Sequence, residues 1–475
     1  MLKNSSQPKG FAVFFLTEMW ERYGFYIINT VLVFYLLAYL HLDDANTIVI
    51  AGSFTALAYL NSIFGGLIAD KFIGYNRALI IGGVLLFLGY MALGSVSDLK
   101  LIFLALSAIT VGTGMLKPNV SSMLSILYAP NDQRKDSGYT LYYVGIYVGA
   151  TSGGLSGGYL KNWFGWDVCF LSAGIGMLIC LFTFIYGASK YKLKDKRHGH
   201  IMPIQMVKSI LSVVALLAIS YNVLQSEYLG VLYFILVALF CFGFILFHII
   251  RHHGVQRSKL IAFLLLIILS ILYWAIYFQQ FFSINLCTER ATDITVPASS
   301  VSTVESIGVI IFGPFINTVW RKYSHVSVAT KFSLSFLFNS VCFLLLSGGL
   351  WYAYTTGHYL SAWFIVIAYL LVSVGELCIS PTSLSMVPSL VPKHLTSAMM
   401  GISLLSIGLG GKLAGVLASI AVISDTKASL GSIKYTYMIS FFDYFIVSIL
   451  TFTVAIILRK YINRLIPKDN QSATV

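Results

Sequence analysis

Long apolar segments separated by short polar stretches run along the whole chain. Each segment has about 20 residues or more, the length that an α-helix needs to cross the hydrocarbon core of a bilayer. The pattern predicts about fourteen membrane-spanning helices, and it places their ends to within a few residues. Their expected ranges are Phe11–Tyr39, Ile48–Ala69, Ala78–Val96, Leu101–Leu127, Tyr139–Leu160, Trp166–Ala188, Ile204–Leu224, Leu229–Ile250, Leu260–Leu286, Ser299–Trp320, Ala329–Tyr354, Ala362–Leu390, Ser397–Val422 and Tyr435–Leu458.

The first apolar segment contains three charged residues, Glu18, Glu21 and Arg22. A charged side chain at the centre of a membrane helix costs about 2.5–3.5 kcal/mol on insertion scales. A helix end that dips into water would avoid this cost, but apolar sequence continues from Phe25 to Tyr39. The three charges therefore indicate a polar pathway inside the membrane.

Composition agrees with a polytopic all-α membrane protein. Hydrophobic residues make up 58% of the chain and charged residues 10%, and the mean hydropathy is +0.84. Soluble domains carry about 25% charged residues. The net charge of +13 therefore belongs to loops and gives no reason to expect nucleic acid as a partner. The six cysteines lie scattered in apolar segments without a CxxC pair, which favours buried thiols over disulfides or metal ligands.

Lysine and arginine are distributed unevenly between the two sets of loops. Alternate loops carry them in a ratio of roughly 23 to 5, and the positive-inside rule places the richer set in the cytoplasm. An even number of spans puts both termini on that same side. We therefore expect a multi-pass protein of the inner (cytoplasmic) membrane with both termini cytoplasmic. The basic run from Lys190 to Arg197 is expected to be a solvated loop.

The segments divide into two halves of six helices with two extra helices between them. A weak internal repeat supports this division: Gly65–Lys71 ends the second segment and Gly313–Asn317 ends its counterpart in the later half, each before a basic turn. We expect a six-helix bundle at residues 1–188, a linker with two transmembrane helices at 189–259, and a second six-helix bundle at 260–475. Paired halves with a substrate site between them are typical of major facilitator transporters.

Five motifs in order along the chain resemble the proton-dependent oligopeptide transporter family, bacterial type. They cover nearly the whole sequence, and together they are specific for the family. The matching segments are Glu18–Tyr23 (EMWERY), Gly112–Asn119 (GTGMLKPN), Tyr142–Gly149 (YYVGIYVG), Trp274–Gln280 (WAIYFQQ) and Gly375–Pro381 (GELCISP).

The resemblance implies a major facilitator fold and a proton-coupled symporter that imports di- and tripeptides by alternating access. It implies no cofactor, a proton gradient as the energy source, and small peptides, protons and the lipid bilayer as partners of a monomer. Two alternatives stay open, a family member that carries a non-peptide, amine-bearing cargo and an exporter of a small metabolite. We expect that the protein is not an enzyme, because the sequence has no HExxH motif, no GxSxG motif and no nucleotide-binding loop.

Candidate coupling residues follow from charge inside the membrane. Lys117 lies in an apolar run, where an amine needs a carboxylate partner or must lose its proton. On a helix, Glu18 shares a face with Glu21 at i+3 and with Arg22 at i+4. One proton can change which of these groups are paired, as a symporter requires. A fixed structural ion-pair cluster is the alternative. Glu376 is a further candidate for protonation.

Candidate substrate residues come from the family positions and from polar groups in apolar segments. The resemblance assigns Glu376 to the free amino end of a peptide, whereas a carboxylate at a water-facing helix end is the alternative. The aromatic candidates could equally be packing residues. The full expected set is Tyr23, Tyr26, Asn29, Tyr59, Lys117, Tyr147, Trp274, Gln279, Glu305 and Glu376. Asp70, Lys71 and Arg77 lie at a loop and are expected to be conformational-switch residues, or simply topogenic charges.

The chain departs from the family pattern at positions around the expected site. Asn29 replaces an arginine and Phe278 an acid, so both partners of one gate salt bridge are absent. Tyr147 and Glu305 stand where asparagines are usual. These changes make the expected site more acidic and favour cargo with extra positive charge, unless Glu305 is protonated. The sequence assigns no role to Lys412 or Asp443.

Overall fold

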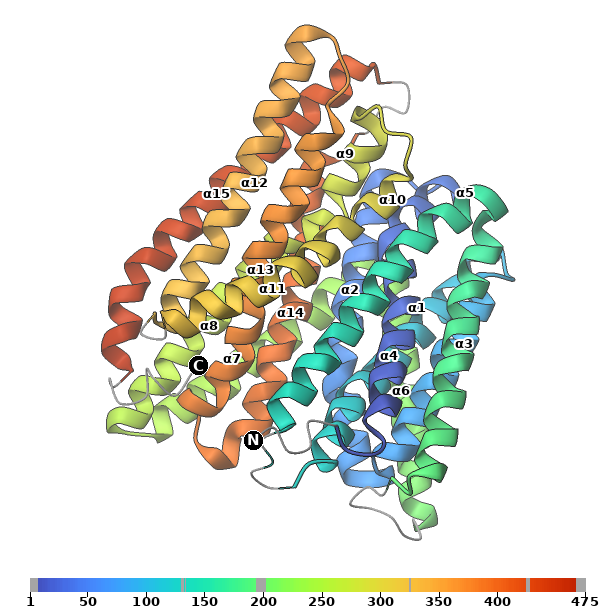
Figure 1. The fold of residues 1–475 in the computed structure, drawn as a ribbon, viewed down its shortest axis with the longest axis vertical. Coiled ribbons are helices and arrows are strands. Elements are labelled where there is room, and N and C mark those ends of the chain that lie inside the picture. Colours follow the sequence, from blue (N-terminus) through green and yellow to red (C-terminus); the bar gives the residue numbers. More distant parts are fainter. Residues whose placement is uncertain are drawn as a thin grey trace, which may run out of the picture. The chain divides into compact units, whose positions relative to one another are not determined.

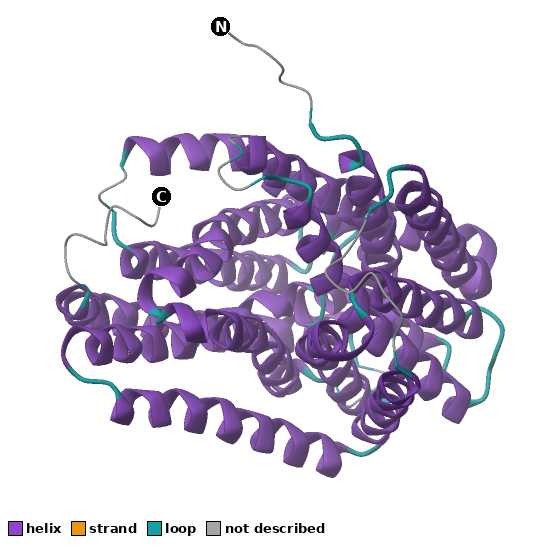
Figure 2. Ribbon diagram, turned by 90° about the horizontal axis from the view of Figure 1, so that it is seen from below, coloured by secondary structure: helices purple, strands orange, loops and turns teal. Residues whose placement is uncertain are grey.

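The computed structural model describes residues 7–129, 132, 134–193, 202–323, 326–423 and 428–466. These residues are almost entirely helical (Figures 1 and 2). The described part of the chain contains no strand, only an isolated bridge between Thr292 and Leu360. A helix pairs every backbone amide internally, which a segment surrounded by lipid requires.

Fifteen α-helices make up the described chain, together with one π-helical and three 3₁₀ turns. They are α1 (Phe11–Ala38), α2 (Asp44–Ile68), η1 (Ala69–Ile73), α3 (Tyr75–Leu93), α4 (Leu99–Ile126), α5 (Arg134–Lys190), α6 (Pro203–Gln225), α7 (Glu227–Arg251), α8 (Gly254–Tyr277), η2 (Phe278–Gln280), α9 (Ser283–Ala291), α10 (Ala298–Val301), α11 (Thr303–Lys322), α12 (Val328–Thr356), α13 (Ala362–Leu390), η3 (Lys393–Leu395), α14 (Thr396–Ala418), η4 (Ser419–Ala421) and α15 (Leu430–Leu465).

The number of membrane-length helices agrees with the number that the hydrophobic pattern predicts. Twelve helical stretches in the described chain are long and apolar enough to cross a membrane. One of them, within α5, contains Gly165 at φ 90°, a left-handed conformation that breaks it into two helices. The 28-residue α1 is long enough as well, although it carries the three charges. With α5 counted as two and α1 added, about fourteen spans result.

The ninth expected span, Leu260–Leu286, differs from the prediction because it is not one continuous helix. The helix α8 ends at Tyr277, a 3₁₀ turn follows, and α9 begins at Ser283. Phe282 has φ −110° and ψ −95°, which no helix can continue through. Since this stretch contains neither glycine nor proline, the sequence carried no break signal.

Two compact units make up the structure. One comprises Met1–Tyr35 and Leu57–Glu227, and the other comprises Leu36–Ala56 and Tyr228–Val475. The first part of α2 therefore belongs to the second unit. Of the two linker helices, α6 groups with the first unit and α7 with the second. The three-part division at residues 188 and 259 stays a prediction.

Close helix approaches in the first unit depend on glycine. A side-chain carbon at Gly65 of α2 would overlap the Gly114 carbonyl of α4. A carbon at Gly149 of α5 would overlap the Met19 carbonyl of α1. Small residues allow such approaches between membrane helices. As a result, α2 lies against α4, and α5 against α1, close enough for polar side chains to meet.

Helices of the second unit pack through both apolar side chains and small hydroxyls. Figure 1 shows α12 beside α15, where the Ser340 hydroxyl donates to the Ser448 hydroxyl over 3.0 Å. The helix α14 packs on α8, with Ser270 and Ser406 joined by a 2.8 Å hydrogen bond. At the start of α2, the Asp43 carboxylate caps the helix by accepting from the Asn46 amide over 2.8 Å. This bond and the Asn46 side-chain amide lower the pKa of Asp43.

Candidate functional site

Glu18, Glu21 and Arg22 form a buried ion cluster on α1 in the first unit. The Arg22 guanidinium donates to both Glu21 oxygens, with a distance of 2.6 Å from Nη2 to Oε1. Its Nε lies 3.6 Å from Glu18 Oε1. All three side chains are buried, and the Arg22 guanidinium also covers the Phe25 ring at 4.5 Å. Glu18 and Arg22, four residues apart on the same face of α1, therefore form an ion pair, and the Arg22 guanidinium lies against two carboxylates.

Tyr142 of α5 completes the contacts of Glu18. Its hydroxyl donates to Glu18 Oε2 over 2.6 Å, and the side chain is buried. The close approach of α5 to α1 at Gly149 makes this contact possible. A short hydrogen bond to a carboxylate stabilises its ionised form. The Glu18 carboxylate is therefore stabilised by a contact from α5 as well as by Arg22.

Lys117 of α4 lies near this cluster. Its Nζ is 4.5 Å from the centre of the Tyr59 ring of α2, within cation–π range. The charge of Lys117 also acts on Glu18. Pro118 follows it inside α4, where the hydroxyls of Ser121 and Ser122 donate to the Pro118 carbonyl. The structure thus brings Glu18, Lys117 and Tyr59 into one neighbourhood, as expected.

The other candidate residues of α1 lie on more than one face. The Tyr23 hydroxyl reaches Ser172 of α5 over 3.4 Å, and its ring lies against Gly176. Tyr26 is half-buried and Asn29 is buried. Tyr147, on α5, is half-buried. Tyr23 is engaged with the second part of α5, while roles for all four in substrate binding stay predictions.

Glu305 and Glu376 form a second cluster of charged residues, in the second unit. Glu305 lies in the first turn of α11 and Glu376 in the middle of α13, and both are buried. The Tyr277 hydroxyl at the end of α8 lies 3.3 Å from Glu305 Oε1 and 3.1 Å from Glu376 Oε2. The Ser306 hydroxyl donates to Glu305 Oε2 over 3.1 Å. Tyr277 was not among the sequence candidates, although Tyr273, Trp274 and Tyr277 form one aromatic group.

Gln279 and Trp274 lie at the break after α8. The Gln279 amide donates to the carbonyls of Ala275 and of Ala414 in α14, and its oxygen accepts from Ser283. Trp274 packs against Gly410 of α14, and its ring nitrogen has no hydrogen-bond partner within the described part of the chain. Gln279 therefore holds the broken helix against α14, while its predicted contact with substrate stays a prediction.

Asp70, Lys71 and Arg77 lie around a sharp helix end. A π-helical turn over Ala69–Ile73 is followed by Gly74 at φ 79°. The Tyr75 hydroxyl donates to Asp70 Oδ1 over 2.7 Å, and Arg77 donates to the Ile73 carbonyl over 3.3 Å. All three charged side chains are exposed. The three residues therefore lie around the turn between α2 and α3, and they belong to neither buried cluster.

Two charged residues without a sequence-assigned role have defined partners. Arg290 of α9 makes a bidentate ion pair with Asp44 of α2, with distances of 2.6 and 2.8 Å, although neither residue belongs to a motif. Both residues lie in polar stretches between the predicted spans, where charges are ordinary, so the sequence carried no signal for this pair. Lys412 of α14 donates to the Ser53 hydroxyl of α2 over 2.9 Å. Both contacts tie the first part of α2 into the second unit.

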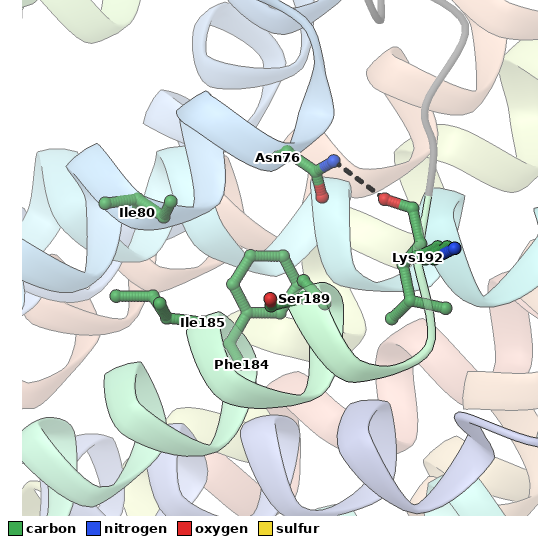
Figure 3. Close-up of a pocket in the computed structure, with 8 residues that line it drawn as sticks. Asn76, Ile80, Phe184, Ile185, Ser189 and Lys192 are labelled. Carbon is green, nitrogen blue, oxygen red and sulfur yellow. Dashed lines mark hydrogen bonds between the residues drawn. The ribbon is translucent and has the colours of Figure 1, made fainter.

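A pocket of about 390 Å³ lies outside both clusters (Figure 3). Its lining comes from the start of α3 and the end of α5, where Asn76 donates to the Leu193 carbonyl over 3.0 Å. Apolar side chains such as Ile80 and Ile185 line much of it. None of the candidate site residues belongs to this pocket. Among the described residues, no group of three or more His, Cys, Asp or Glu could hold a metal ion.

Comparisons with known proteins agree along nearly the whole chain. The sequence model of the POT family matches residues 76–436. Dipeptide and tripeptide permease A of Escherichia coli (strain K12) is 30% identical over 443 residues, covering 89% of this chain and 87% of the relative. The protein of the same name from Serratia proteamaculans (strain 568) is 29% identical over 446 residues, covering 91% and 88%.

Solved structures share the fold. A bacterial homologue of the human drug peptide transporters PepT1 and PepT2 has a TM-score of 0.85 at 23% identity, covering 96% of this chain and 99% of the other. A structure on substrate recognition in proton dependent oligopeptide transporters has a TM-score of 0.86 at 24% identity, covering 96% and 99%.

The family model and the permease relatives identify a membrane transport protein rather than an enzyme, and the described helices have the fold of the solved transporters. The chain belongs to the POT family. Both the fold class and the family expected from the five motifs are thereby confirmed.

Proposed function

We propose that this protein is a proton-coupled symporter that imports di- and tripeptides across the inner membrane by alternating access. Family membership and relatives named dipeptide and tripeptide permease support the substrate class. In this proposal the protein works as a monomer, needs no cofactor and has both termini in the cytoplasm. Energy comes from the proton gradient.

The observation that carries the proposal is the contact of Arg22 with two buried carboxylates. Arg22 lies against both carboxylates, and Tyr142 donates to Glu18. Protonation of one carboxylate frees Arg22 to pair with the other, and it changes the charge that acts on Lys117. Such an exchange of partners couples proton binding to helix movement, because buried charges do not stay unpaired.

Two charged residues are assigned to the two ends of the peptide. Lys117 is the proposed cation for the peptide carboxylate, and Glu376 is the proposed anion for the peptide amino group. Asp70, Lys71 and Arg77 act as conformational-switch residues at the loop.

Proteoliposomes containing the purified protein test the proposal. Uptake of labelled dialanine is measured with an outside-acid pH gradient, with an inside-negative potential, with both, and with neither. We expect accumulation under either gradient, the most under both, and none after a protonophore is added. Equal uptake with and without the gradients would contradict proton coupling.

A competition panel separates peptide transport from the two alternative functions. It compares dipeptides, tripeptides, free amino acids and amine-bearing small molecules as inhibitors of dialanine uptake. We expect inhibition by di- and tripeptides only. Uptake of a labelled amine by protein that takes up no dialanine would favour the non-peptide cargo. Peptide-independent efflux of a preloaded metabolite would favour an exporter.

A further inference from the structure

Glu305 has an unusual environment for a buried carboxyl group. Its side chain is 1% exposed, and its contacts in the described chain are the hydroxyls of Tyr277 and Ser306 and the carboxyl group of Glu376. None of these is a cation. A buried carboxylate needs a compensating charge or a proton. The contacts of Glu305 therefore favour a proton.

Glu305 and Glu376 are close enough to share that proton. The Tyr277 hydroxyl lies 3.3 Å from Glu305 Oε1 and 3.1 Å from Glu376 Oε2. A phenol hydroxyl has one proton to donate, so a hydrogen bond from it to each carboxyl group requires that one of the two carries a proton and donates it to the phenol oxygen. Paired carboxyl groups in a water-poor site hold one proton in common, because like charges at this distance do not both ionise.

A second group of polar atoms converges beside this pair. The Tyr273 hydroxyl and the Asn339 side-chain amide are fully buried and have no hydrogen-bond partner among the described residues. An added carbon at Gly375 would lie 3.3 Å from the Tyr273 hydroxyl and from the Ser335 carbonyl, and 3.6 Å from Asn339 Oδ1. The polar groups of Tyr273, Ser335 and Asn339 thus lie around Gly375, next to Glu376.

We propose that Glu305 and Glu376 form a second proton-binding site, in which one proton is held between the two carboxyl groups until the substrate's amino group displaces it. Before binding, the pair has a net charge of −1. After binding, two carboxylates face one ammonium group, and one proton has left. The net charge of the site is −1 before and after binding, because the ammonium group brings in one positive charge as the proton takes one out, so the exchange is balanced.

The displacement by a substrate amino group rests on the proposed function, whereas the shared proton does not depend on it. The displacement has one consequence that a simple anionic site for the amine lacks. Amine and proton compete for the same pair, so peptide affinity falls at low pH through Glu305 and Glu376. A site with Glu376 alone holds no shared proton, so it lacks this competition.

Infrared difference spectroscopy on the full-length protein in lipid, without peptide, detects the proton. We expect a carboxylic-acid carbonyl band in the wild type that is absent in Glu305→Gln and in Glu376→Gln. The matched control is Glu289→Gln, since Glu289 is an exposed glutamate on α9, and its band pattern should equal the wild type. Glu305→Asn, with the residue usual in the family, serves as a second variant. A wild-type band unchanged in both Glu305 variants would overturn the inference.

Proton release on binding detects the exchange. Dialanine is added to purified protein in weak buffer with a pH indicator, and binding is measured in parallel. We expect the wild type to release about one more proton per bound peptide than Glu305→Gln does. Equal release would overturn the displacement. If the wild type binds no peptide, the proposed function fails, while the infrared band still decides whether the pair shares a proton.

Discussion

The two buried clusters balance their acidic groups by different means. In the first unit, Glu18 and Glu21 lie against Arg22, a cation that is always charged. In the second unit, Glu305 lies against hydroxyls and the carboxyl group of Glu376. A permanent cation lets the first cluster respond to a proton by changing partners. In our proposal the second cluster responds by losing its shared proton to an incoming ammonium group.

Removing Arg22 should have the largest effect, because it leaves two carboxylates buried without their cation. We expect Arg22→Ala to destabilise the protein by about 3–5 kcal/mol and to abolish driven uptake. Thermal unfolding of the purified protein in detergent measures the first effect and proteoliposome uptake the second.

Arg290→Ala is the matched comparison for Arg22→Ala. Arg290 also makes an ion pair, with Asp44, but its side chain is 25% exposed, against 3% for Arg22. Water can compensate the remaining carboxylate in part, so a smaller loss of stability is expected. If both arginine variants unfold at the same temperature, burial does not make the Arg22 ion pair contribute more to stability than the Arg290 ion pair.

Glu376→Gln is expected to have the next largest effect, on peptide binding. Loss of the counterion for the peptide amine should weaken dialanine binding by about 2–5 kcal/mol, the range for a buried charge pair. Calorimetry or competition measures it. N-acetylated dialanine should bind the wild type equally poorly, and wild-type protein that accepts both peptides alike would exclude Glu376 as the amine site.

Tyr142→Phe tests whether Glu18 depends on α5. The change removes one hydrogen bond to a carboxylate, worth about 1.5–3 kcal/mol. We expect a shift in the pH dependence of driven uptake with little change in counterflow. Tyr139→Phe is the control, because Tyr139 lies one turn earlier on α5 and donates to the Ser121 carbonyl. Equal pH profiles for both variants would remove Tyr142 from the coupling cluster.

The smallest expected effect concerns side-chain charge in the cargo. Glu305 makes the site more acidic in formal charge, but a proton shared with Glu376 removes one negative charge. We therefore expect Ala-Lys, Ala-Ala and Ala-Glu to inhibit uptake of a reporter peptide within about tenfold of each other, or about 1.4 kcal/mol. A strong preference for Ala-Lys that Glu305→Gln abolishes would show instead that the pair is fully ionised.

Much of the fold could be predicted from the hydrophobic pattern, because lipid requires long, uninterrupted apolar helices. The range Ala362–Leu390 agrees with α13 at both ends, and the helix periodicity correctly places Glu18 beside Arg22. The break between α8 and α9 could not be predicted, since tertiary contacts of Gln279 with α14 hold it.

The candidate site was predictable only where residues are close in sequence or in a motif. The contact of Tyr142 with Glu18 joins positions 124 residues apart, and that of Tyr277 with Glu376 joins positions 99 apart. Helix packing brings these pairs together, and no local spacing encodes it. The same reason explains why the ion pair of Asp44 and Arg290, separated by 246 residues, escaped prediction.

Driven uptake and counterflow, measured on the same proteoliposomes, test proton coupling through the first cluster most directly. Glu21→Gln and Lys117→Ala are compared with the wild type and with Glu289→Gln. We predict that both cluster variants lose accumulation under an outside-acid gradient but still exchange labelled dialanine against internal dialanine. The control should do both. Full gradient-driven accumulation by Glu21→Gln and Lys117→Ala would contradict the account.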